Sequence, residues 1–338
     1  MKTIKTLPLL LLAAGLCFAF IAGCKSSTKG KVDVSDVKNI PVYIFRFDSA
    51  LFTVDPGNLQ EQLKTLAPKF PFFLGGDLDD TLNLMQMHDF ITDPEVIQVS
   101  RYCQVLYPDL SGIELAFTEA FRYYRHYFLG KPQPAVYTYV SNYADVEFPV
   151  KYIDSTLIIA LDMYLGKKFK SYLETGIPVY KINRMSREFI LPDCMKEIAS
   201  TDLIPDMDNK TLLDEMIREG KKLYFADLTL PALSDEVKIG YTSSQLKWCF
   251  ENEENIWIFM IENKLLYSTY FQAFSKFVTD GPFTADFSTE SPAKTGNWIG
   301  WQIVRAYMKN NPDVTPMQLM KNQDSQRILT EAHYKPGK

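Results

Sequence analysis

The side chains that carry most enzymatic chemistry are scarce in this sequence of 338 residues. It holds three histidines, and no two of them lie four residues apart, as a zinc-binding helix requires. It also lacks the strand-to-helix elbow of serine hydrolases and the glycine-rich loop that binds phosphate groups. The sequence therefore predicts no catalytic residue, no metal site and no cofactor.

Carboxylates are the more plentiful candidates. Glu215 and Glu219 lie one helical turn apart, so both can face one cleft, as the paired acids of a glycosidase do, or both can face solvent. Asp77, Asp79 and Asp80 resemble a calcium loop only loosely, because the spaced ligands and the final glutamate are missing. Neither pattern is specific for a reaction.

Aromatic residues make up 14% of the chain and offer a third kind of site. Such side chains line binding grooves and partner interfaces, although most of them belong to the core of a folded protein. The candidates for a groove or a partner interface are Tyr123, Tyr124, Tyr137, Tyr139, Tyr143, Trp298 and Trp301.

Cys24 is the candidate for a covalent modification. Two lysines precede an apolar, uncharged run over residues 7–22, which closes on Ile-Ala-Gly-Cys at residues 21–24. Small side chains let a peptidase reach the bond before a cysteine whose thiol then carries a lipid, and the apolar run is short for a membrane span. Residues 1–23 are predicted to be a lipoprotein signal peptide, with a fatty-acyl chain such as palmitate on Cys24. The alternative is an ordinary secretory signal.

The remainder of the chain has the composition of a folded protein, with 46% hydrophobic residues. Residues 24–39 are predicted to form a flexible tether, which reaches on the order of 20 Å, and residues 40–338 a single globular domain. Loss of the two signal lysines moves the formal net charge from −5 to −7. This acidity, with scattered basic residues, argues against nucleic acid as a partner.

Three cysteines remain after Cys17 and Cys24 are set aside. They are Cys103, Cys194 and Cys249. An export compartment permits one disulfide among them, but the helical, apolar context of Cys103 and Cys249 favours free buried thiols.

Local patterns predict an α-rich α+β fold, a helical body around a small central sheet. Alternation over residues 42–48 indicates a strand that runs into a short helix at 49–52, and residues 134–140 and 156–161 are β-rich. Asp93 before Pro94 begins one helix. Capping boxes begin four more, at Ser111 with Glu114, Thr211 with Asp214, Thr242 with Gln245 and Thr315 with Gln318.

Several short motifs occur in the same order as in a known family. They are Arg46-Phe47-Asp48 with Leu51-Phe52, Tyr107-Pro108, Asp162-Met-Tyr-Leu-Gly166, residues 213–221 and Gly296-Asn-Trp-Ile-Gly300. Over most of its length after the signal, the chain resembles the gliding-motility lipoprotein B family of the Bacteroidetes. The resemblance implies a place in the cell-envelope machinery for surface gliding and type IX secretion, without an assigned chemical activity.

The order of elements is also distantly similar to the zincin class of zinc metallopeptidases. The helix equivalent to their metal-binding helix would lie near residues 192–200, where Glu197 has no histidine pair beside it. Glu215 or Glu219 would stand where a third ligand can lie. The resemblance implies a zincin-like scaffold without its metal, whose groove would be lined by Glu197, Glu215, Glu219, Trp298 and Trp301.

The expected function is that of a non-enzymatic lipoprotein that binds a protein partner in the cell envelope. An atypical metallopeptidase-like hydrolase and a purely structural lipoprotein are the alternatives. No acidic cluster follows Cys24, so we expect an outer-membrane anchor that faces the periplasm.

Overall fold

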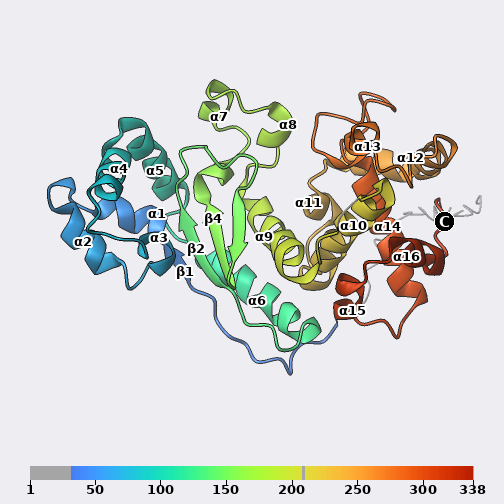
Figure 1. Cartoon of the computed structure of the whole chain (residues 1–338), viewed down its shortest axis with the longest axis horizontal. Helices are drawn as coiled ribbons and strands as arrows, with labels where there is room; N and C mark the ends of the chain where they lie inside the picture. Colours follow the sequence, from blue (N-terminus) through green and yellow to red (C-terminus); the bar gives the residue numbers. More distant parts are fainter. Residues whose placement is uncertain (1–31, 208–209, 338) are drawn as a thin grey trace, which may run out of the picture. The chain divides into compact units, whose positions relative to one another are not determined.

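The computed structural model describes residues 32–207 and 210–337, so the predicted signal peptide and Cys24 lie outside the described residues. Residues 34–338 form one compact unit (Figure 1). The unit includes residues 34–39, which the sequence assigns to the tether. Val34 is buried there, and Arg122 and Arg125 donate hydrogen bonds to the carbonyl oxygens of Val37 and Lys38 at 3.2 and 2.7 Å.

The sheet has four strands in the order β1-β2-β4-β3. Strands β1 (Ile44–Arg46), β2 (Ala135–Tyr139) and β4 (Thr156–Ala160) are parallel, and β3 (Val150–Ile153) pairs antiparallel with β4. The three parallel strands match the three predicted segments, whereas β3 was not predicted. Together with the many helices, this sheet confirms the α-rich α+β class.

Helix α6 (Ser111–Tyr127) closes the outer edge of β1. The Glu114 carboxylate accepts a hydrogen bond from the Ile44 amide at 2.8 Å, and the Thr118 hydroxyl accepts one from the Val42 amide at 2.9 Å. The predicted capping box at Ser111 is therefore wrong. Glu114 is used by the strand, and the Ser111 amide donates instead to Asp109 at 3.0 Å.

The other predicted helix starts are confirmed. Asp93 accepts hydrogen bonds from the first turn of α5 (Pro94–Leu106), and complete capping boxes begin α10 (Leu212–Thr229), α12 (Ser243–Glu262) and α15 (Pro316–Lys321). The remaining helices have the following bounds: α1 (Phe47–Ala50), α2 (Leu59–Leu66), α3 (Pro71–Leu74), α4 (Thr81–Thr92), α7 (Lys170–Glu174), α8 (Val179–Ile182), α9 (Ile190–Ile198), α11 (Asp235–Ile239), α13 (Phe271–Val278), α14 (Thr295–Asn310) and α16 (Ser325–Ala332).

The buried side chains form two hydrophobic clusters. The larger one runs from the sheet and α6 through α9, α10 and α14 to the C-terminal helices, and it contains the three free cysteines. The smaller one lies under residues 47–92, which we call the cap (Figure 1). Tyr137 of β2 belongs to this second cluster, so the cap packs directly against the sheet.

Helices α10 and α14 approach each other most closely at two glycines. A Cβ atom built on Gly300 would lie 1.7 Å from the Met216 carbonyl oxygen, and one built on Gly220 would lie 2.4 Å from the backbone of Gly300. Both glycines fall within the family-like motifs of the sequence. Their role there is to let two backbones touch.

Candidate functional site

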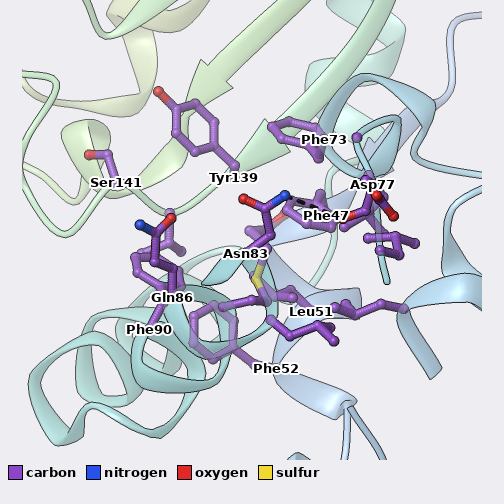
Figure 2. A pocket seen from close by; sticks show the side chains of 18 of the residues that line it. Phe47, Leu51, Phe52, Phe73, Asp77, Asn83, Gln86, Phe90, Tyr139 and Ser141 are labelled. Carbon is purple, nitrogen blue, oxygen red and sulfur yellow. Dashed lines mark hydrogen bonds between the residues drawn. The ribbon is translucent and has the colours of Figure 1, made fainter. Parts of the chain in front are cut away.

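An apolar pocket of about 610 Å³ opens between the cap and the sheet. Its floor begins where the adjacent parallel strands β1 and β2 end, at Phe47 and Asp48 on one side and Tyr139 to Ser141 on the other. Crevices at the carboxyl ends of parallel strands are common ligand sites, because the chain leaves the sheet there in diverging directions. We call this the cap pocket (Figure 2).

Aromatic rings form much of its wall. Phe47 stacks on Phe73 with ring centroids 4.3 Å apart, and Tyr139 lies 5.8 Å from Phe73. On the opposite side, the rings of Phe52 and Phe90 are 6.1 Å apart. The aliphatic and thioether side chains that complete the wall are Leu51, Leu63, Leu74, Leu78, Leu84 and Met87.

The one carboxylate at the floor is neutralised within the fold. Asp48 is buried and forms an ion pair with Arg46 at 2.7 Å, and the Thr138 hydroxyl donates a further hydrogen bond to it. Arg46 also donates to the Tyr107 carbonyl oxygen. The Arg-Phe-Asp motif thus turns the chain from β1 into the cap, and it leaves the Phe47 ring facing the pocket (Figure 2).

Polar groups occupy the rim. The Asn83 amide donates to the Asp77 carbonyl oxygen at 3.3 Å, while Gln86 lies exposed beside it (Figure 2). Tyr139 donates its hydroxyl to Asp145, which also binds Lys151 at 2.8 Å. Burial and this hydrogen bond raise the pKa of Tyr139, so the phenol stays protonated at neutral pH.

Of the residues that the sequence analysis proposed, only two line this pocket. Tyr139 was one of the aromatic groove candidates and Asp77 one of the loose calcium-loop acids, and both line the pocket. Trp298 and Trp301 do not. Both are fully buried in α14, so neither forms a surface that a partner can contact.

Glu197 and Glu219 come together in a second, smaller cleft of about 270 Å³ between α9, α10 and the segment before β3. Basic side chains occupy it as well. Lys196 pairs with Asp193 at 2.9 Å, Lys222 pairs with Glu219, and Arg218 lies 3.8 Å from Glu219. Glu215 lines neither pocket and pairs with Lys210 at 3.5 Å.

Neighbouring positive charges determine the protonation state of Glu219. Burial favours the neutral acid, but the charges of Lys222, Arg218 and Lys294 together hold the pKa of this carboxyl below its usual range. Glu219 is therefore ionised and already paired. Within residues 32–207 and 210–337, no group of three His, Cys, Asp or Glu side chains is placed to hold a metal ion.

Comparison with known proteins places the chain in a family. The model of the gliding motility protein GldB family matches residues 27–336, almost the whole sequence. The chain belongs to this family. The matched region contains the cap, the sheet and all helices named above, so both pockets are features of a GldB-family body. No curated protein and no solved structure shows a significant match.

The GldB assignment agrees with the lipoprotein character that the sequence predicts, because the family model describes lipoproteins of gliding motility. In the part of this GldB-family chain that the structure describes, no helix is both long enough and apolar enough to cross a membrane.

Proposed function

We propose that this GldB-family chain is a non-enzymatic lipoprotein of the cell envelope that binds a partner protein through the cap pocket. The observation that carries the proposal is the pocket itself. Its mouth opens to solvent and its lining is mainly apolar, and the burial of apolar surface is the main driving force of most protein association.

The pocket has the dimensions of a recognition site. Its volume of about 610 Å³ lies within the range of roughly 300–1,000 Å³ that is typical of ligand sites. Its apolar wall with polar groups at the rim is also the usual composition of such sites.

Capture from envelopes tests this function. Gln86→Trp places a large ring at the pocket mouth, and Gln98→Trp makes the same change on an exposed position of α5 that does not line the pocket. Crosslinking in detergent-solubilised envelopes should recover a stoichiometric partner with the wild type and with Gln98→Trp, but not with Gln86→Trp. Equal recovery with both variants would refute the cap pocket as the contact.

The second cleft supports the non-enzymatic part of the proposal. Asp193 and Glu219 are paired with lysine and arginine side chains, so a metal ion or a substrate proton at either acid would have to displace an existing cation, and Glu197 accepts a hydrogen bond from the Thr201 hydroxyl at 2.9 Å. The alternative is a degenerate or atypical metallopeptidase-like hydrolase, for which Glu197 and Glu219 are the predicted acids that lie in this cleft. Stoichiometric zinc after chelator-free purification, with turnover of a peptide panel, would establish that alternative.

The anchor is proposed to be lipid on Cys24, in the outer membrane and facing the periplasm. Labelling with a palmitate analogue should mark the wild type and fail with Cys24→Ala, whose body should then leave the membrane fraction. Protease added to intact cells should spare the wild-type chain. Digestion in intact cells would place it on the cell surface instead.

A further inference from the structure

The charges at the mouth of the cap pocket indicate the chemistry of its occupant. We propose that its occupant is an apolar side chain presented by a basic segment of the partner protein. This inference rests on the proposed function, because it names the chemistry of the partner at the same site. The argument comes from the charges at the pocket mouth.

The rim carries more negative than positive charge. Asp77 lines the mouth, and Asp80 lies just outside the lining, where it caps α4 by accepting a hydrogen bond from the backbone amide of Asn83 at 3.0 Å; Asn83 itself lines the pocket. Among the described residues, no lysine, arginine or histidine forms an ion pair with Asp77 or Asp80. The other acids near the pocket do have cations: Asp79 pairs with Lys64 and Asp145 with Lys151.

These two unpaired acids select among apolar occupants. A fatty acid or an anionic phospholipid would bring a net negative headgroup to a negative rim, where like charges repel each other. A protein segment with lysine or arginine beside its apolar residue would instead place opposite charges together. The chain's own segment from residue 25 to 31 is basic but contains no apolar side chain, so it does not supply the occupant.

The rim also offers groups for a peptide backbone. Gln86 is exposed, and none of the described residues hydrogen-bonds its side-chain amide. The Asn83 side chain faces the pocket near Phe47 (Figure 2). Side-chain amides both donate and accept, so they match the N–H and C=O groups that flank an inserted side chain.

Two short fluorescent peptides test the occupant. They share one phenylalanine and one leucine spaced by a helical turn, and they differ only in carrying lysines or glutamates at the other positions. The lysine peptide should bind the full chain in detergent more tightly than the glutamate peptide. The difference should fall in high salt, because salt screens exposed charges.

Removal of the rim charge provides the matched variants. Asp77→Asn with Asp80→Asn keeps a side-chain oxygen at each position, which can accept the hydrogen bonds that the Asp79 and Asn83 backbone amides donate in the wild type. It should weaken the lysine peptide roughly fivefold and leave the glutamate peptide no weaker. The control is Asp109→Asn with Asp324→Asn, two exposed capping acids that do not line the pocket, and it should change neither affinity.

Two results would overturn the inference. They are equal binding of the two peptides and tighter binding of the glutamate peptide. Each leaves the proposed function in place as long as Gln86→Trp still loses the envelope partner, so the two failures are distinguishable. Loss of peptide binding in Gln86→Trp, with retention in Gln98→Trp, would support the pocket as the peptide site.

Discussion

Replacement of Gly300 by alanine tests the packing that holds the GldB-family body together. The added Cβ would lie 1.7 Å from the Met216 carbonyl oxygen and 2.4 Å from its carbonyl carbon, both in the backbone of α10. No rotamer relieves such a contact, because the position of an alanine Cβ is fixed by its own helix backbone and the atoms it meets are backbone atoms of the other helix. To reach a contact of about 3.0 Å the helices must separate by at least about 1.3 Å at their crossing, which disturbs the close packing of the interior.

The cost follows from the two opposing effects of this substitution. Overpacking in a core costs typically about 1–3 kcal/mol, and a backbone contact with Trp298 and Trp301 packed beside it belongs at the upper end. Alanine is favoured over glycine within a helix by up to about 1 kcal/mol. The net loss should be about 2–3 kcal/mol, which for a unit of this size lowers Tm by about 4 °C.

Thermal and urea unfolding followed by circular dichroism give the measurement. Gly112→Ala is the matched control, because this glycine also lies in a helix, α6, and its added Cβ would meet only the end of the Arg187 side chain at 3.4 Å. That variant should be unchanged or slightly more stable. If Gly300→Ala were as stable as the wild type, α10 and α14 would not cross as described.

Three further predictions follow from buried groups. Arg305→Met removes two hydrogen bonds to Asp227, at 2.7 and 2.8 Å, and should cost about 3 kcal/mol in urea unfolding at pH 7. Burial raises the pKa of Asp227, but the Arg305 guanidinium lowers it, and the net pKa lies below the ordinary carboxyl value. This stabilisation is therefore present above the ordinary carboxyl pKa, and the difference in stability between the two proteins should shrink as pH falls below about 4. Burial lowers the pKa of Lys221 to about 8, so the unfolded chain binds more protons between pH 8 and 10 and wild-type stability should rise over that range. Lys221→Met should lose about 2 kcal/mol of that rise. An equal rise in both proteins would contradict the lowered pKa of Lys221. The three buried cysteines, whose thiol pKa values burial raises, should react with a thiol reagent only after unfolding, and fast labelling of the native protein would contradict their burial.

The elements that local sequence determines were predictable. The caps at Asp93, Thr211, Thr242 and Thr315 involve groups within a few residues of each other, so the sequence pattern already contains both partners. The central strands were equally readable from their β-branched and aromatic residues.

The predictions that the structure contradicts concern features that depend on contacts between residues far apart in the sequence. Ser111 and Glu114 have the spacing of a capping box, but the Ile44 amide, 70 residues away, binds Glu114 instead. An edge strand with open amides competes for any acceptor placed beside it, and local spacing does not record that competition. The tryptophans failed in a similar way. Composition does not distinguish an aromatic side chain in the core from one in a groove, and both proved to be buried.

The cap pocket could not be predicted for the same reason. Its walls come from the start of the cap, from α3 and α4, and from the end of β2, and the parallel pairing of β1 with β2 brings these segments together. Such pairing joins segments that are separated by a long crossover, so no window of sequence contains the site. Tyr139 was a candidate only as one aromatic residue among several.

The two pockets differ in what binding would cost, and this difference favours the cap pocket. A ligand that enters the cleft at Glu219 must break ion pairs that already satisfy its charges, so each new contact replaces an existing one. Among the described residues that line the cap pocket, Asp48 is the one buried carboxylate, and it is already paired with Arg46, so an apolar side chain can enter without breaking an ion pair of Asp48. Burial of apolar surface contributes about 25 cal/mol per Å². A single inserted aromatic side chain therefore yields more free energy here than a charged group yields in the cleft, where attraction and desolvation nearly cancel.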